Sequence, residues 1–315
     1  MFKVSIVIRA YNEAKNLPNL FYGIKQQTIK PDEIILVDSE SADDTVNIAR
    51  DHKCKILTIS KQDFTFGRSL NLGCKKASSD IIVICSAHCF PKKKDWIEQL
   101  IAPFNWKKNI GMTYGKQRGL EQSNFSEKQL FHQLFPSIYP NKLEFFSNNA
   151  NSAILKKVYD EVEFDETLTG CEDIDFSKKI AKRNYKTLYC PKATILHLHN
   201  ETFGQIINRY YREMIALQKI LPNFYIPRRS IFQYISNLGS DLTTMVRKKT
   251  FNFKTIEEIL KFRTAMVLGI LKARSKKEIT CPKQFKEIYF NNNSNNNYNN
   301  NVKDENLTIH YKLFS

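Results

Sequence analysis

Short apolar runs alternate with longer segments of helical periodicity over the first two thirds of the chain. The runs predict strands at residues 4–9, 33–37, 55–59, 81–85, 110–116, 149–154 and 186–197, and the segments between them predict helices near 14–27, 43–51, 68–78 and 95–104. Several runs are apolar at every position, which is typical of strands that are covered on both faces. This alternation of strands and helices predicts an α/β fold with a parallel sheet.

Beyond residue 205 the pattern is helical. Apolar residues recur at helical spacing in one stripe: Ile256, Ile259, Leu260, Val267, Ile270 and Leu271. Basic residues flank it: Arg247, Lys248, Lys249, Arg274, Lys276 and Lys277. Two interpretations are open, because the stripe can pack on the α/β core or a second copy of the chain, or lie on an anionic bilayer. We expect an α/β domain at 1–220, a basic helical extension at 221–290 and a disordered Asn-rich tail at 291–315.

The chain of 315 residues is long enough to bury a full core, and it carries a formal net charge of +16. Residues 201–290 hold 17 Lys and Arg against 7 Asp and Glu, so most of the excess lies beyond the predicted sheet. A basic surface attracts polyanions, such as nucleic acid, anionic lipid or acidic glycan. No nucleic-acid-binding motif accompanies the charge, so we predict that nucleic acid is not a partner.

The sequence also gives an expectation about location. Its seven cysteines are scattered without a C-x-x-C pair, which indicates free thiols in a reducing compartment. No apolar run approaches the roughly 18 to 20 residues that cross a bilayer, and the first residues already form a predicted strand. We therefore expect a cytoplasmic protein, with peripheral contact at the inner face of the membrane left open.

The first two predicted strands end in polar turns. The first strand runs into Tyr11, Asn12 and Glu13, and the second runs into Asp38 and an acidic, hydroxyl-rich stretch. Neither turn has the glycine spacing of a dinucleotide-binding loop. Ligands of open α/β sheets bind at the carboxyl ends of the strands. Carboxylates and amides at those ends suit a base amide and sugar hydroxyls better than a pyrophosphate.

The segments VSIVIRAYNEAKNL and IILVDSESADDT resemble the nucleotide-binding half of family 2 glycosyltransferases, and the resemblance covers roughly residues 2–220. It implies the Rossmann-like GT-A fold, here with a C-terminal helical extension. It also implies transfer of a sugar, with inversion, from a nucleotide-diphosphate donor to a glycan or lipid-linked acceptor in capsular or other cell-surface polysaccharide synthesis. The donor-binding residues implied by the resemblance are Ala10, Tyr11, Asn12, Glu13, Asp38, Glu40, Arg68, Asn71, Ser86, Ala87 and His88.

The segment FGRSLNLGCKKASSDIIVICSAHCFP resembles bacterial rhamnosyltransferase-like members of the family. Many GT-A enzymes carry a D-x-D motif here, but Ser86 and His88 replace the two aspartates. The resemblance implies a divalent metal on His88, His197 and His199, and imidazole ligands favour Mn²⁺ over Mg²⁺. The alternative is that His88 binds a phosphate directly, without metal. Arg68 is a natural partner for the diphosphate, since a guanidinium matches phosphate oxygens.

The segment FDETLTGCEDIDF resembles the acidic segment of inverting family members. It implies that Asp173 is the general base and that Glu172 binds or orients the acceptor. A helix N-terminus stabilises such carboxylates, although the same preference places acids in many first turns that have no catalytic role. Asn149 and Asn151 lie in an amide-rich stretch and are expected to contact the acceptor.

Two other classes of function stay open at this point. The lost D-x-D motif would also suit a non-catalytic GT-A-like scaffold in a polysaccharide assembly complex. A nucleic-acid-binding protein would rest on the net charge alone.

Overall fold

The computed structural model describes residues 2–106, 108–138, 145–221, 230–249 and 251–274, without the side chains of 230–233. The strands are β1 (Val4–Ala10), β2 (Glu33–Asp38), β3 (Lys55–Thr58), β4 (Ile81–Ser86), β5 (Cys89–Pro91), β6 (Ile110–Gly119), β7 (Asn151–Leu155) and β8 (Lys186–His197). The helices are α1 (Leu17–Lys25), α2 (Thr45–Asp51), α3 (Phe66–Lys76), α4 (Trp96–Ile101), α5 (Pro103–Trp106), α6 (Phe125–Leu134), α7 (Lys156–Glu161), α8 (Glu172–Ala181), α9 (Phe203–Ile220), α10 (Ser230–Arg247) and α11 (Phe253–Arg274). The end of the expected basic extension and the expected Asn-rich tail at 291–315 lie outside the described residues.

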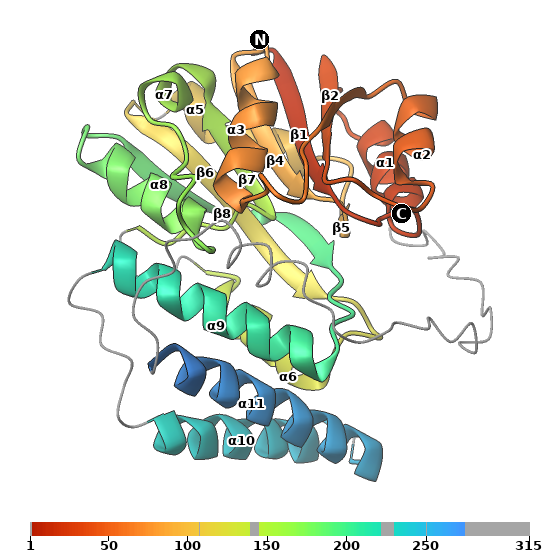
Figure 1. Cartoon of the computed structure of the whole chain (residues 1–315), viewed down its shortest axis with the longest axis vertical. Coiled ribbons are helices and arrows are strands. Elements are labelled where there is room, and N and C mark those ends of the chain that lie inside the picture. Colours follow the sequence, from red (N-terminus) through yellow and green to blue (C-terminus); the bar gives the residue numbers. More distant parts are fainter. Residues whose placement is uncertain (1, 107, 139–144, 222–229, 250, 275–315) are drawn as a thin grey trace.

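The strands form one twisted sheet in the order β3-β2-β1-β4-β7-β6-β8-β5 (Figure 1). Strands β1 to β4 are parallel, but β7 runs antiparallel to both β4 and β6. The sheet is therefore mixed, where the sequence predicted a parallel one. The reason is that a strand covered on both faces is apolar throughout, whichever way it runs.

Apolar side chains pack on both faces of the sheet. In β1, Ile6 and Ile8 join the core on the side of α1, where Leu17 is buried. Val7 joins the core on the opposite side, where α3 contributes Leu70. Both faces of this central strand are thus in the core, which explains why its apolar run shows no alternation.

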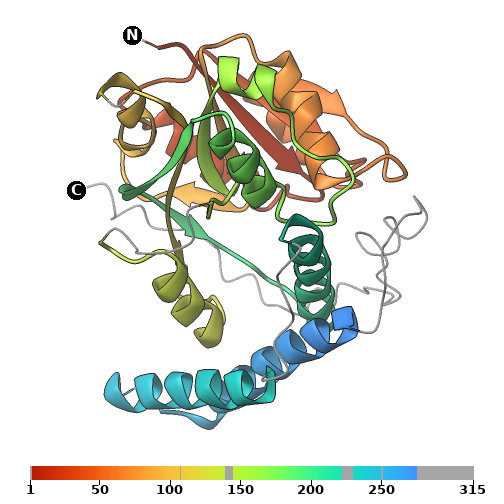
Figure 2. The ribbon, with the colours of Figure 1, turned by 90° about the vertical axis from the view of Figure 1, so that its left-hand side faces the viewer.

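Helices α6, α9, α10 and α11 form a layer at one end of the molecule, with α9 between the sheet and the hairpin of α10 and α11 (Figures 1 and 2). Gly269 brings the backbone of α11 close to α9. A Cβ atom at this position would lie 2.4 Å from the carbonyl oxygen of Ile207. None of the helices in the described part of the chain is long and apolar enough to cross a bilayer.

Part of the apolar stripe predicted in α11 packs against protein. Ile259 is fully buried in a cluster with Phe125 of α6 and Met245 of α10. Ile270 packs on Tyr211 of α9. Leu260 and Leu271 of the stripe stay exposed. Helices α6, α9 and α10 therefore cover only part of this face, and contact of the remainder with a bilayer stays a prediction.

A buried ion pair joins the two C-terminal helices. Arg263 of α11 donates from Nε and Nη2 to the two carboxylate oxygens of Asp241 of α10, at 2.8 and 2.9 Å. The hydroxyl of Ser126 in α6 donates to the same carboxylate at 2.6 Å. Both charged side chains are fully buried, so neither can exchange its partner for water. These bonds hold the α10–α11 hairpin against α6.

We expect Arg263→Met to lower the free energy of unfolding by about 3–5 kcal/mol, because it leaves the Asp241 carboxylate buried without its partner. Urea denaturation followed by circular dichroism measures the change. Lys261→Met is the matched control in the same helix, since its ion pair with Glu257 is exposed and its loss should leave the midpoint nearly unchanged. Equal shifts in the two variants would contradict the importance given to the buried pair.

Candidate active site

The carboxyl ends of β1 and β2 form one side of the site. Ala10 lies opposite Asp38 in the sheet register, and the Asp38 side chain is almost fully buried. Its Oδ2 accepts the backbone N–H of Ser41 at 3.1 Å, whereas Oδ1 is buried without a hydrogen-bond partner. An unpaired buried acceptor is costly. A base amide or a ribose hydroxyl would satisfy it, as the nucleoside-binding role predicted for Asp38 requires.

The turns beyond these strands are braced against their neighbours. Asn12 and Glu40 adopt positive φ angles of 54° and 56°. The backbone N–H of Asn12 donates to the Ser41 hydroxyl at 2.9 Å, and the Glu40 carboxylate accepts the backbone N–H of Lys61 at 2.9 Å. The ammonium group of Lys61 lies 4.8 Å from the ring centroid of Tyr11, which is partly exposed. Asn12 and Glu40 thus shape the turns that follow β1 and β2.

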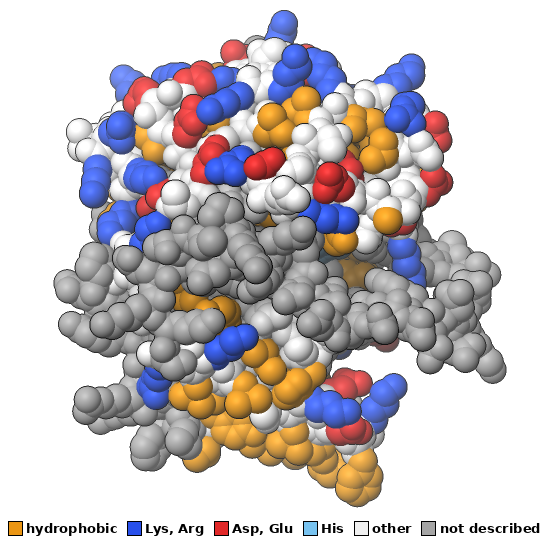
Figure 3. Space-filling view, in the orientation of Figure 1, with side chains coloured by type: hydrophobic (Ala, Val, Ile, Leu, Met, Phe, Trp, Pro, Cys, Tyr) orange, Lys and Arg blue, Asp and Glu red, His pale blue; other side chains and the backbone are white. Residues whose placement is uncertain are grey.

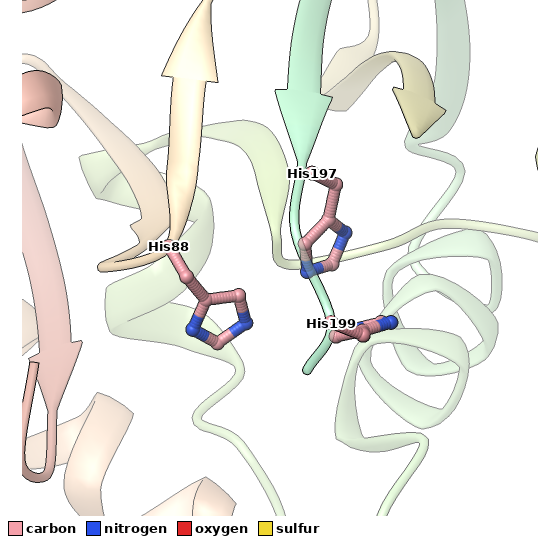
Figure 4. A group of neighbouring side chains, drawn as sticks. All are labelled: His88, His197 and His199. Atoms are coloured by element: carbon pink, nitrogen blue, oxygen red, sulfur yellow. The ribbon is translucent and has the colours of Figure 1, made fainter. Parts of the chain in front are cut away.

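Three histidines meet beside the same edge, and Figure 4 shows their rings grouped together. His88 follows β4, His197 ends β8 and His199 comes two residues later. Their ring centroids lie 5.1 Å apart for His88 and His197, 5.6 Å for His88 and His199, and 4.1 Å for His197 and His199. One ligand atom from each side chain lies within 4.8 Å of the other two. The sequence prediction that these histidines act together is thus compatible with the structure.

Each of the three imidazoles uses its Nδ1 to bind a protein oxygen. The Nδ1 to Oε1 distances are 2.7 Å for His88 and Glu13, 2.7 Å for His197 and Gln117, and 2.6 Å for His199 and Glu127. A carboxylate only accepts, so Nδ1 is the donor toward both glutamates. The amide nitrogen of Gln117 donates to Asn148 at 2.8 Å, which leaves the Gln117 oxygen as the acceptor for His197. In the neutral rings each Nε2 therefore keeps its lone pair, as in histidines that bind metals.

The electrostatic surroundings fit a divalent cation. Nε2 of His197 is buried and has no hydrogen-bond partner. Burial, together with the nearby charges of His199 and His88, lowers the pKa of His197 well below its ordinary value, so this ring stays neutral. Burial also opposes a charge on His88, but the Glu13 carboxylate outweighs it and raises the pKa of His88. Imidazoles backed by carboxylates are a donor set that suits a divalent metal.

Glu127 connects the histidines to α9. It accepts a hydrogen bond from Arg209 at 3.0 Å, and Arg209 also forms an ion pair with Glu201 at 2.7 Å. Burial opposes the charge on Glu127, but His199 and Arg209 lower its pKa below the usual range. Glu127, His199 and Glu201 are close enough to form a second metal-ligand group. Since Arg209 already neutralises both carboxylates, the three-histidine group is the better metal site.

Glu172 and Asp173 begin α8, and both side chains are buried. The Asp173 carboxylate accepts the backbone N–H of Asn149 at 2.9 Å and that of Ile174 at 2.8 Å. Burial, followed by the charge of the neighbouring Glu172, raises the pKa of Asp173 to about 7. A carboxylate with this pKa is suited to accept a proton at neutral pH.

Arg9 joins the acid pair to the sheet edge. Its Nη1 lies 3.7 Å from Oε1 of Glu172, and its guanidinium lies over the ring of Phe66, 4.5 Å from the centroid. Arg9 is opposite Ser86 in the register of β1 and β4. The acid pair therefore lies beside the strand ends that lead to the nucleotide turns and to His88.

Three asparagines that were expected at the site are hydrogen-bonded within the protein. The Asn71 amide binds the backbone N–H and C=O of Phe164 and the side chains of Tyr159 and Glu166. These four hydrogen bonds leave none of its capacity for a sugar donor. Asn151 is fully buried and binds Trp96 and two backbone carbonyls. Ligand contacts of Asn71 and Asn151 would therefore compete with hydrogen bonds inside the protein. Asn149 is also buried, and its backbone N–H and side-chain amide donate to the acid pair.

Other expected donor-binding residues are also engaged with the protein. Arg68 donates to Glu166 at 2.9 Å and to the Asp63 carbonyl at 2.8 Å, so it would have to leave Glu166 to reach a diphosphate. The carboxylate of Glu13 binds His88, and its second oxygen accepts from Asn16 at 2.7 Å. Ala87 is fully buried, whereas Ser86 is half-buried at the end of β4.

Sequence reasoning missed Arg9, Gln117 and Glu127. Arg9 is a charged residue in an otherwise apolar strand, and that interruption was a usable signal. Gln117 stands between Lys116 and Arg118 and gave no such signal. Glu127 lies in α6, and its sequence neighbourhood gave no indication that it would meet His199.

Comparisons with known proteins bear on this arrangement. The sequence model of the family described as Glycosyl transferase family 2 matches residues 5–162. The chain belongs to this family. The O-antigen chain rhamnosyltransferase RfbN of Salmonella typhimurium is 30% identical over 222 residues, which cover 66% of this chain and 70% of that protein. The O-antigen chain rhamnosyltransferase WbaN of Salmonella anatum is 26% identical over 220 residues, which cover 66% and 70%. The chain is therefore a glycosyltransferase.

Two solved structures resemble this glycosyltransferase in fold. The mannosyltransferase PcManGT of Pyrobaculum calidifontis, in complex with GDP-Man and Mn²⁺, aligns with a TM-score of 0.60 at 14% identity over 88% of each chain. The glucosyl-3-phosphoglycerate synthase of Mycobacterium tuberculosis, in complex with Mn²⁺, UDP and phosphoglyceric acid, aligns with a TM-score of 0.53 at 16% identity, over 70% of this chain and 78% of that one. The expectation of a GT-A fold is confirmed.

We expect Gln117→Leu to weaken Mn²⁺ binding by about 10–100-fold, because it removes the oxygen that orients His197. The Mn²⁺ signal in electron paramagnetic resonance, recorded with UDP or GDP present, measures the free metal. His132→Ala is the matched control, since this exposed histidine lies outside the three-histidine group. An unchanged Mn²⁺ affinity in Gln117→Leu would contradict a role for the oriented His197 in holding the metal.

Proposed function

We propose that this chain is an inverting glycosyltransferase that uses Asp173 as its general base. The observation that carries the proposal is the buried pair of Glu172 and Asp173 at the start of α8, beside the strand ends that hold Asp38 and His88. Direct displacement at an anomeric carbon needs one base near the acceptor hydroxyl. Asp173 meets this need because its pKa is raised to about 7 and backbone N–H groups fix its carboxylate.

In the proposed reaction, Asp173 takes the proton of the acceptor hydroxyl while the hydroxyl oxygen bonds to the anomeric carbon of the donor. The bond from that carbon to the diphosphate oxygen breaks in the same step, and the nucleoside diphosphate leaves with the electron pair. Because the acceptor attacks from the face opposite the leaving group, the anomeric configuration inverts. Asn149 is a positioning residue that holds Asp173 and Glu172.

The proposed donor is a nucleotide-diphosphate sugar. Asp38 would bind the nucleoside through the oxygen that lacks a protein partner. Arg9 is a cation at the same edge that sequence reasoning did not include. The structural relatives support this class of donor, since their complexes contain GDP-Man and UDP.

The proposed metal ligands are His88, His197 and His199. A bound divalent metal would neutralise charge on the leaving diphosphate as a Lewis acid. The protein's part is to present three imidazoles whose Nδ1 atoms are already held. We favour Mn²⁺ over Mg²⁺ because imidazole is a softer ligand than carboxylate. Among the relatives, the mycobacterial synthase has been solved both with Mn²⁺ and with Mg²⁺.

We place the reaction in cell-surface polysaccharide synthesis at the cytoplasmic face of the membrane, with a glycan or lipid-linked acceptor. The two Salmonella relatives, both O-antigen chain rhamnosyltransferases, support this assignment. Capsule synthesis would use the same chemistry.

The second candidate is the non-catalytic scaffold. The intact acid pair argues against it, since a scaffold has no need to bury two adjacent carboxylates at such a cost. A panel of UDP-, GDP- and dTDP-sugars with Mn²⁺ separates the two: binding raises the melting temperature in either case, but only the enzyme releases nucleoside diphosphate in the presence of acceptor.

We expect Asp173→Asn to reduce kcat by at least about 10²-fold while donor binding stays intact, because the amide cannot take the acceptor proton. Turnover and donor affinity are measured separately. Asp175→Asn, in the same helical turn and paired with Lys179, is the control and should keep near-normal turnover. Near-normal kcat in Asp173→Asn would move the role to Glu172 or elsewhere.

The raised pKa of Asp173 predicts opposite pH trends for activity and stability. Activity needs the carboxylate, so kcat/KM should fall about tenfold per pH unit below about 7. The folded state holds the proton of the Asp173 carboxyl more tightly than the unfolded chain does. The contribution of protonated Asp173 to the free energy of unfolding is therefore present below about pH 4 and is lost as pH rises to about 7. In Asp173→Asn this part of the stability loss should disappear. A kcat/KM profile that is flat from pH 5 to 8 would argue against Asp173 as the base.

A further inference from the structure

The turn between α10 and α11 exposes two phenyl rings. Phe251 is 61% exposed and Phe253 is 84% exposed, and their ring centroids lie 6.2 Å apart in an edge-to-face arrangement. Val246, near the end of α10, is also exposed. Figure 3 shows hydrophobic side chains on the lower end of the molecule, where α10 and α11 lie. We call residues 246–249 and 251–254 the hairpin tip.

All charged residues of the hairpin tip are basic. Arg247, Lys248, Lys249 and Lys254 are all exposed, and residues 242–256 contain no Asp or Glu. The first three cations suit the C-terminus of α10, where the helix dipole favours positive charge. Lys254 lies in the first turn of α11, where the dipole disfavours it. Helix stability therefore does not explain the positive charge on both sides of the turn.

Exposed aromatic rings among cations match the interface of an anionic bilayer. Aromatic side chains favour the headgroup region, and basic residues are attracted to the surface potential of anionic lipids. We propose that the hairpin tip docks on a bilayer that contains anionic lipids, with Phe251 and Phe253 inserted and the four cations on headgroups. This surface is distinct from the face of α11 around Ile259, which the fold covers.

A bilayer fits the hairpin tip better than a second copy of the chain. Two copies meeting at this surface would bring like charges together, which opposes association. Phe251 and Phe253 are exposed on a turn at the end of the helical layer (Figure 1), so a surface that deforms around the two rings can bury both. The buried pair of Asp241 and Arg263 fixes the hairpin on α6 and gives the tip a firm base.

Docking at this end would connect the membrane to the active site through α9. Helix α11 packs on α9, and α9 begins shortly after His199. A lipid-linked acceptor would then be held near the enzyme. Only this consequence rests on the proposed function, because vesicle binding is measured without any sugar transfer.

Co-sedimentation of the whole chain with phosphatidylcholine vesicles, with and without phosphatidylglycerol, tests the docking. We expect binding that needs phosphatidylglycerol and weakens at high salt. Phe251→Ser with Phe253→Ser should remove most of it, and Lys248→Ser with Lys249→Ser should weaken it about 30-fold. Ile235→Ser is the matched control, since Ile235 is an exposed apolar residue of α10 outside the hairpin tip.

Phe253→Trp gives a direct reading of insertion. Its fluorescence should shift to the blue with anionic vesicles and be quenched by brominated lipid, beyond the change seen from Trp96 and Trp106 in the unaltered chain. Indole fluorescence that stays at its aqueous wavelength overturns the proposal.

Three further results would also overturn it. Binding that survives the loss of both rings would show adsorption of charge alone. Equal binding without phosphatidylglycerol would remove the role of the cations. Self-association without vesicles that disappears in the double Phe variant would identify an interface between copies. A chain that docks as expected but transfers no sugar refutes the proposed function and leaves the docking intact.

Discussion

The antiparallel pairing of β5 with β8 brings the three histidines into one small volume. Cys89 lies opposite His197 in this register, and the backbone N–H of Leu198 donates to the carbonyl oxygen of His88 at 3.1 Å. A strand of only three residues thus brings the turn after β4 to the end of β8. Since side chains alternate along an extended chain, His197 and His199 point to the same side and can face His88. Every other feature of the proposed metal site depends on this register.

Around that constraint the protein builds two different electrostatic environments. The imidazoles are oriented by Glu13, Gln117 and Glu127, so that each ring has one nitrogen held and one available. On the other side of the strand ends, burial and a neighbouring like charge push the pKa of Asp173 upward. The first arrangement suits a cation with its diphosphate, and the second suits a proton acceptor. The C-terminal helices join this system, because Ser126, which binds the buried Asp241, directly precedes Glu127.

The sequence located the strands and several site residues for identifiable physical reasons. Strands buried on both faces appear as apolar runs, and Asp38 and His88 lie just after such runs. The direction of β7 leaves no trace in such a run, and β5 is too short to show a pattern. The sequence did not reveal the internal hydrogen bonds of Asn71 and Asn151, because an amide looks the same in sequence whether it binds a ligand or the protein. Gln117 and Glu127 were missed because their partners lie far along the chain.

The stereochemistry of the product tests the central claim most directly. Once a nucleotide sugar is found that the enzyme consumes, nuclear magnetic resonance of the product, taken before any anomerisation, gives the configuration of the new glycosidic bond. A single displacement with Asp173 as base predicts a configuration opposite to that of the donor. Retention of the donor configuration would contradict the account, because it would require a different reaction course at the anomeric carbon.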